Sequence, residues 1–168
     1  RDKGIVELVE AARLLRAQNR NVRVILAGGL DELNPSCLRA EEIHAWEREG
    51  LIEWWGEVDD VRRVWAEAHL AVLPSYREGL PKSLLEAAAC GRALIATDVP
   101  GCREIVQHEK NGLLVPVRTA APLAAAMAHL LDNAPLRLHM AKAGRALMEC
   151  EFAQARINAE TLAVYEEL

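Results

Sequence analysis

The chain has 168 residues, 51% of them hydrophobic, with 20 basic and 25 acidic side chains that leave a formal charge of −5. This length and apolar content predict one domain over residues 1–168 with one compact core. The charges are mixed along the sequence, which argues against a nucleic-acid-binding protein, and no apolar run approaches the roughly 20 residues that span a bilayer.

Helical and strand patterns alternate along the chain. Apolar residues from Ile5 to Leu15 recur at helical spacing, and Val22 to Ala27 is a nearly continuous apolar run typical of a strand buried on both faces of a sheet. Helices are then expected near 41–49, 59–68, 81–91 and 100–106, strands near 51–55, 70–73, 93–96 and 113–115, and closing helices near 123–131, 136–147 and 157–168. The alternation predicts an α/β fold, a Rossmann-like open parallel sheet flanked by helices on both faces.

Ligands of open α/β sheets bind beyond the carboxyl ends of the strands, and the loop 74–81 is the richest in chemistry there. It places the carboxylate of Glu78 and the flexible Gly79 directly before a helix that Pro81 is suited to start. Glu86 follows about one and a half turns into that helix. Two carboxylates so placed can accept hydrogen bonds from vicinal hydroxyls of a sugar or ribose, beside a helix N-terminus that favours an anion.

The same spacing has a simpler interpretation, in which Glu78 caps a turn, Glu86 is a solvated helix residue and Gly79 serves the turn alone. The segment Glu78 to Glu86, however, resembles the E-x(7)-E signature of glycosyltransferase family 4, a group of retaining enzymes with the GT-B fold. The resemblance covers nearly the whole chain. Its other ordered matches lie at residues 2–5, 27–29, 55–58, 73–76, 96–101 and 111–116.

The resemblance implies roles for residues around this loop. Glu78 would contact hydroxyls of the sugar being transferred, Gly79 and Leu80 would line the sugar and diphosphate through their backbone, and Glu86 would hold the ribose. Lys3 would bind the diphosphate and stabilise the leaving group, although a terminal Lys is often only solvated.

Weaker matches concern the base and the edge of the cleft. Val58 matches a segment that meets the nucleobase through its main chain, and it can equally be an ordinary residue at the end of a strand. Pro100 and Gly101 match a loop near the cleft.

The resemblance also implies elements that this sequence lacks. Family members carry a central strand and a phosphate-binding Arg before the Lys-Gly element, so the fold is expected to be the C-terminal half of a GT-B fold with a truncated first strand. An amino-terminal acceptor-binding domain would complete the enzyme, and residues 152–168 would form the crossover helix. Neighbouring strand edges would then be unpaired, which raises the hypothesis of self-association through an exposed sheet edge.

The sequence therefore predicts a domain that binds a UDP- or GDP-linked sugar, from a retaining enzyme that acts on a glycan or lipid-linked acceptor and is inactive as an isolated domain. Two alternatives stay open: a nucleotide-sugar epimerase of similar architecture, and a non-catalytic nucleotide-binding module. No metal or cofactor is expected. The chain has no G-x-G-x-x-G after a strand, which argues against a dehydrogenase.

The cysteines and histidines point to no further chemistry. Four scattered cysteines form no C-x-x-C pair, and the five histidines show no triad or metal-binding spacing. A reducing cytoplasm is the expected location, with peripheral membrane contact only through the full-length protein. The four cysteines are Cys37, Cys90, Cys102 and Cys150.

Overall fold

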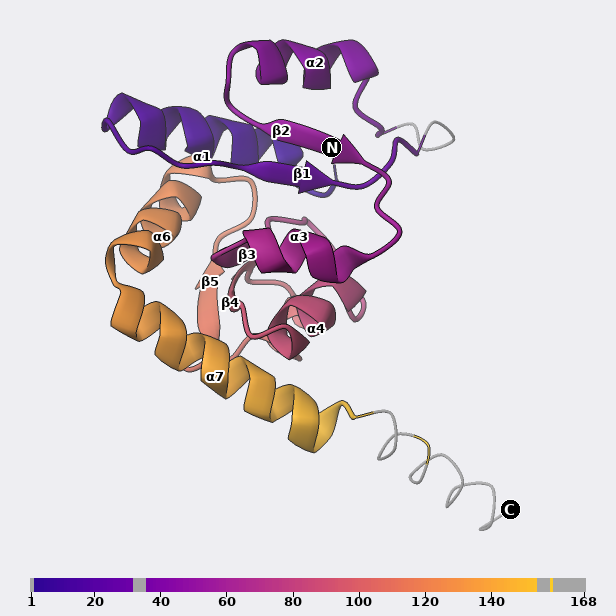
Figure 1. Cartoon of the computed structure of the whole chain (residues 1–168), viewed down its shortest axis with the longest axis vertical. Helices are drawn as coiled ribbons and strands as arrows, with labels where there is room; N and C mark the ends of the chain where they lie inside the picture. The colour runs from indigo at the N-terminus through magenta and orange to yellow at the C-terminus, as the bar shows by residue number, and fades with distance from the viewer. Residues whose placement is uncertain (1, 32–35, 154–157, 159–168) are drawn as a thin grey trace.

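The computed structural model describes residues 2–31, 36–153 and 158, and it shows the predicted alternation of helix and strand (Figure 1). The helices are α1 (Ile5–Ala17), α2 (Ala40–Arg48), α3 (Val61–Glu67), α4 (Lys82–Ala89), α5 (Pro100–Arg103), α6 (Ala120–Asp132) and α7 (Ala134–Glu151). The strands are β1 (Ile25–Ala27), β2 (Glu53–Gly56), β3 (Leu70–Leu73), β4 (Ala93–Thr97) and β5 (Gly112–Val115). Except for Asn158, residues from 154 onward lie outside this description, and with them most of the predicted crossover helix.

All described strand pairs are parallel, as predicted, but they form two sheets where the sequence predicts one. One sheet pairs β1 with β2, and the other has the order β3-β4-β5. Strands β1 and β3 each have one hydrogen-bonded neighbour, and residues 21–27 and 68–74 line a cavity of about 760 Å³ between them. The remaining strands therefore do not close the gap within the described chain, and β1 is half-buried to exposed, not buried on both faces.

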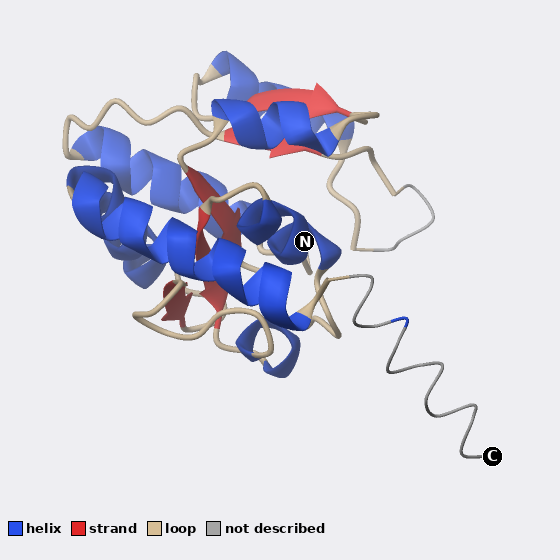
Figure 2. Cartoon of the chain, turned by 60° about the horizontal axis from the view of Figure 1, so that its bottom comes forward, coloured by secondary structure: helices blue, strands red, loops and turns tan. Residues whose placement is uncertain are grey.

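The core is organised around β4, in which all five side chains are buried. Successive side chains of a strand point to opposite faces, and β4 accordingly feeds two apolar clusters. Ala93 and Ile95 pack with residues of α1 and α6, whereas Leu94 and Ala96 pack with residues of α4, α5 and α7. Helices thus cover both faces of the larger sheet, as predicted (Figure 2).

Most element ends follow the expected local chemistry. The Asp60 carboxylate accepts a hydrogen bond from the backbone N–H of Arg62 at 3.1 Å and so caps α3. Gly50 and Gly91 follow α2 and α4 with φ of 68° and 67°, a conformation that glycine adopts without strain. Some predicted bounds are wrong: β1 begins at Ile25, three residues late, α5 ends at Arg103, three residues early, and Pro81 is the N-cap of α4. Helix α7 extends to Glu151, four residues beyond its predicted end. Within the described ranges, no helix is long and apolar enough to cross a membrane.

We expect Ile95→Ala to lower the free energy of unfolding by about 2–5 kcal/mol, because it empties a fully buried site in the central strand. Leu138→Ala is the matched control, since Leu138 is 60% exposed on α7, and it should change stability by less than about 0.5 kcal/mol. Urea denaturation followed by circular dichroism measures both. Equal losses for the two variants would contradict the central position of β4.

Candidate functional site

Three loops leave the larger sheet at the carboxyl ends of its strands. Leu73 is in register with Ala96, and Thr97 is in register with Val115. The parallel strands therefore end together, and the loops 74–81, 98–101 and 116–119 begin side by side. Ligands of open α/β sheets bind at this carboxyl end of the strands, which is called the carboxyl edge of the sheet below.

Lys3 and Glu78 meet at this edge, although they are 75 residues apart in sequence. The Lys3 Nζ donates a hydrogen bond to Glu78 Oε1 at 2.6 Å. The Glu78 side chain is only 10% exposed, whereas Lys3 is 62% exposed. The structure thus joins two of the residues that the sequence singled out, one largely withdrawn from water and one open to it.

The backbone around Lys3 is seated on the loop that follows β3. The Tyr76 N–H donates to the Asp2 carbonyl at 2.9 Å. Gly4 has φ of 67°, and a Cβ there would lie 2.0 Å from the Pro74 carbonyl oxygen, so only glycine allows this contact. These backbone contacts bring Lys3 to the carboxyl end of β3.

The two members of the ion pair differ in how far they are exposed to water and in how many hydrogen bonds they can still form. Withdrawing a carboxylate from water is costly unless a charge and hydrogen bonds compensate, and Lys3 supplies both to Glu78. An ammonium group has three N–H donors, and one is directed to Glu78 Oε1. The exposed side of Lys3 can therefore bind an anion while its contact with Glu78 remains.

Tyr76 is fixed by groups from two other elements. Its hydroxyl donates to Glu7 Oε1 on α1 at 2.5 Å, and the Arg118 guanidinium lies 4.7 Å from its ring centroid. Burial and the hydrogen bond to Glu7 raise the pKa of the Tyr76 phenol, so it stays protonated at neutral pH. Sequence spacing gave no sign of this network, because its members come from three distant segments.

Buried polar groups lie beneath the Glu78 loop. The Thr97 hydroxyl donates to the Ser75 carbonyl, and both residues are fully buried. Burial, with the negative charge of Glu78 as a second cause, raises the pKa of the Cys102 thiol to about 11. Thr97 and Cys102 belong to the β4–α5 segment, which includes the motif match at residues 96–101.

The loop leaves open space beyond Glu78. No atom lies within 4 Å of the position that a Cβ of Gly79 would take, and Leu80 is 52% exposed. Helix α4 begins at Lys82, directly after this open segment. The first N–H groups of a helix have no partner within it, so the open segment and the helix start together offer backbone donors to a ligand.

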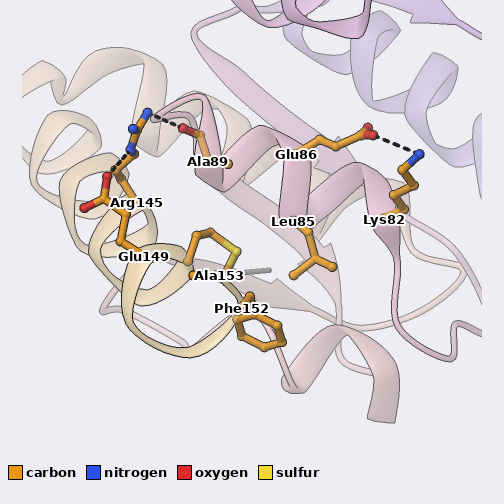
Figure 3. Close-up of a pocket in the computed structure, with 9 residues that line it drawn as sticks. Lys82, Leu85, Glu86, Ala89, Arg145, Glu149, Phe152 and Ala153 are labelled. Atoms are coloured by element: carbon orange, nitrogen blue, oxygen red, sulfur yellow. Dashed lines mark hydrogen bonds and ion pairs between the residues drawn. The ribbon is translucent and has the colours of Figure 1, made fainter. Parts of the chain in front are cut away.

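Glu86 lies on α4 beside a second cavity of about 440 Å³ (Figure 3). Its carboxylate is 3.5 Å from the Lys82 ammonium. Arg145 on α7 lines the same cavity and donates to the carbonyl of Ala89, the last residue of α4, at 2.6 Å. Neither Lys3 nor Glu78 lines this cavity. Lys3 lines the larger cavity and Glu86 the smaller one, so a ligand that touches Lys3, Glu78 and Glu86 would extend along the start of α4.

Val58 lies after β2, is half-buried and lines neither cavity. Its proximity to a base therefore stays a prediction. Across the described ranges, no group of three or more His, Cys, Asp or Glu side chains is placed to hold a metal ion.

Comparisons with known proteins give a consistent result. The sequence profile described as glycosyl transferases group 1 matches residues 1–133. Over 140 residues, the chain is 36% identical to the N,N'-diacetylbacillosaminyl-diphospho-undecaprenol alpha-1,3-N-acetylgalactosaminyltransferase of Campylobacter jejuni, covering 83% of this chain and 35% of that protein.

Two solved structures match with a TM-score of 0.87. HepE from Anabaena, in complex with UDP, is 24% identical, with 99% of this chain and 46% of that one covered. Sucrose-phosphate synthase from Thermosynechococcus elongatus is 28% identical, with 99% and 42% covered. The chain spans less than half the length of each of these relatives.

Proposed function

The chain belongs to the group 1 glycosyl transferases, and we propose that it is the C-terminal, donor-binding half of a retaining family 4 enzyme. Its α/β fold is that of its GT-B structural neighbours. The enzyme would move a sugar from a UDP- or GDP-linked sugar to a glycan or lipid-linked acceptor. The observation that carries this proposal is the Lys3–Glu78 pair beside the start of α4.

The pair suits the two halves of a diphosphate sugar. The exposed ammonium of Lys3 and the N-terminus of α4 would bind the diphosphate, as both stabilise negative charge. The Glu78 carboxylate has a second oxygen that can accept hydrogen bonds from sugar hydroxyls. Gly79 and Leu80 would face the sugar and diphosphate through their backbone, in the open space beside Gly79.

Glu86 would hold the ribose of the nucleotide. Its carboxylate is half-buried at the edge of a cavity, and a carboxylate can accept hydrogen bonds from both hydroxyls of a ribose. Val58 would meet the base through its main chain. That HepE was crystallised with UDP supports a nucleotide in this fold.

The chemistry would depend on charge and position, without a metal or cofactor. As the bond to the leaving diphosphate breaks, negative charge grows on its oxygen, and Lys3 with the start of α4 would stabilise that charge. The acceptor hydroxyl would attack from the same face, which retains the anomeric configuration, and its proton would pass to the departing diphosphate oxygen, while Glu78 orients the sugar. Orientation and preorganised electrostatics would supply most of the rate.

The whole enzyme would need more than this domain. The relatives are more than twice as long as the matched segment, and we propose that an amino-terminal domain binds the acceptor, so that this domain alone transfers no sugar. We propose a cytoplasmic location for the enzyme, with peripheral membrane contact through the full-length protein.

The gap between the sheets supports a separate proposal, that copies of this chain associate through the unpaired edges of β1 and β3. Sedimentation velocity over a range of concentrations should show a monomer–dimer equilibrium. Leu26→Lys places a charge on edge strand β1 and should shift the equilibrium to monomer. A monomer at every concentration would reject this proposal and leave the sugar-donor site untouched.

For the two glutamates, we expect a division of labour. Glu86→Ala should weaken binding of the bare nucleoside diphosphate about tenfold, because it removes charged hydrogen bonds to the ribose. Glu78→Ala should weaken binding of the complete nucleotide sugar more than that of the nucleotide. Calorimetry with both ligands measures the split, with the exposed Glu10→Ala as control. Equal losses for both ligands in both variants would contradict these roles.

For Lys3, the informative comparison is between a nucleoside and its diphosphate. Lys3→Ala should weaken diphosphate binding about tenfold and leave nucleoside binding unchanged, since the lost charge faces the phosphates. Lys142→Ala removes an exposed lysine of α7 and serves as control. The proposed role fails if diphosphate affinity is unchanged in titrations at low salt, where charge interactions are strongest.

A further inference from the structure

The peptide that joins Glu78 to Gly79 rests directly on Gly101. A Cβ built on Gly101 would lie 2.1 Å from the Gly79 carbonyl oxygen and 2.4 Å from the Glu78 carbonyl oxygen. Real side chains do not approach backbone so closely, so any other residue at 101 would push this peptide away by roughly 1 Å or more. Gly101 is buried in α5, so the surrounding core resists the opposite shift.

A second contact holds the start of the same loop. The Thr97 hydroxyl, at the carboxyl end of β4, donates to the Ser75 carbonyl, and both residues are 1% exposed or less. Loss of this hydrogen bond would leave the buried Ser75 carbonyl without the Thr97 donor, which costs free energy. The loop that carries Glu78 is thus hydrogen-bonded to Thr97 at Ser75 and packed closely against Gly101 at Gly79.

The segment that makes these contacts is itself firmly placed. The Asp98 N–H donates to the Val115 carbonyl at 2.8 Å, and the Arg103 guanidinium donates to the Asp98 carboxylate at 2.6 Å. The Cys102 thiol next to Gly101 lies close enough to Glu78 to feel its charge. Segment 97–101 is therefore tied to the buried strand on one side and to the Glu78 loop on the other.

We propose that segment 97–101 positions the Glu78 carboxylate for the sugar of the nucleotide sugar, with Gly101 and Thr97 as positioning residues that touch no ligand. This inference rests on the proposed function of the site. The hydrogen bond and the close backbone contacts of segment 97–101 reach residues 75, 78 and 79, whereas Val99 reaches α4 only as a member of the apolar cluster beneath it. Glu86 lies further along α4, so the ribose end of the site is expected to depend on this segment less than the Glu78 end does.

Gly101→Ala tests the proposal against Gly144→Ala. Gly144 is also buried, but a Cβ there would meet its nearest atoms at 3.7 Å, an ordinary contact. Calorimetry should show Gly101→Ala binding UDP-glucose or GDP-mannose, whichever the unchanged chain binds better, at least about tenfold more weakly. The matching nucleoside diphosphate should lose less than about threefold, and Gly144→Ala should bind both like the unchanged chain.

A readout without ligand accompanies the binding data. In Gly101→Ala, the backbone amide signals of residues 78–80 should shift in nuclear magnetic resonance spectra, while Cys102 stays protected from alkylation by iodoacetamide. That combination identifies a displaced loop above an intact α5. Protection of Cys102 follows from its burial and its raised thiol pKa, so rapid labelling would instead indicate that α5 had opened, and would overturn a purely positional role.

If Gly101→Ala does not fold, the variants of Thr97 test the same idea. Thr97→Val removes the hydroxyl and should weaken sugar-nucleotide binding selectively, whereas Thr97→Ser keeps the hydroxyl and should restore it. Equal weakening for both ligands, or no rescue by Ser, would overturn the inference. Failure of the unchanged chain to bind any nucleotide sugar would instead reject the proposed function itself.

Discussion

The complete burial of β4 is the constraint on which the rest of the structure depends. Its five side chains are buried, and both of its edges are paired in parallel, with β3 and with β5. Helices must then cover both faces, and the strand registers align the carboxyl ends of β3, β4 and β5 at the carboxyl edge of the sheet. The loop that carries Glu78 and the segment that carries Gly101 both leave this edge, so their contact follows from the packing of an apolar strand.

The Lys3–Glu78 pair shows how that edge combines stability with reactivity. The nine-tenths burial of the Glu78 side chain has a desolvation cost that Lys3 offsets only in part, since an exposed ammonium is screened by water. A ligand that supplies hydroxyl donors to the carboxylate and an anion to the ammonium would improve both partners at once. If the proposed function holds, a nucleotide sugar carries both groups.

The sequence predicted local elements well and long-range contacts poorly, for physical reasons. Helix α1 and strand β3 have unambiguous periodicity, and both occur where predicted. Strand β1 was predicted to be buried on both faces, but apolar content does not report whether a neighbouring strand is present. The motif included Gly101, but its contact is with backbone atoms of Glu78 and Gly79, so the sequence could not indicate the partner. The motif gave the positions of Lys3 and Glu78, and the structure alone gave their contact.

The site has two ends that are anchored to different parts of the fold. The Glu78 end is held directly by β4 and α5. The Glu86 end lies on α4, which packs against β4 and α7 and whose Ala89 carbonyl accepts a hydrogen bond from Arg145. Both ends share one apolar cluster, so a change at one end reaches the other only through core packing, and its direct effect is expected at its own end. If the proposed function holds, the preference for a sugar can then change with less effect on the nucleotide, because a shift of segment 97–101 moves the Glu78 peptide directly and reaches Glu86 only through the packing of α4.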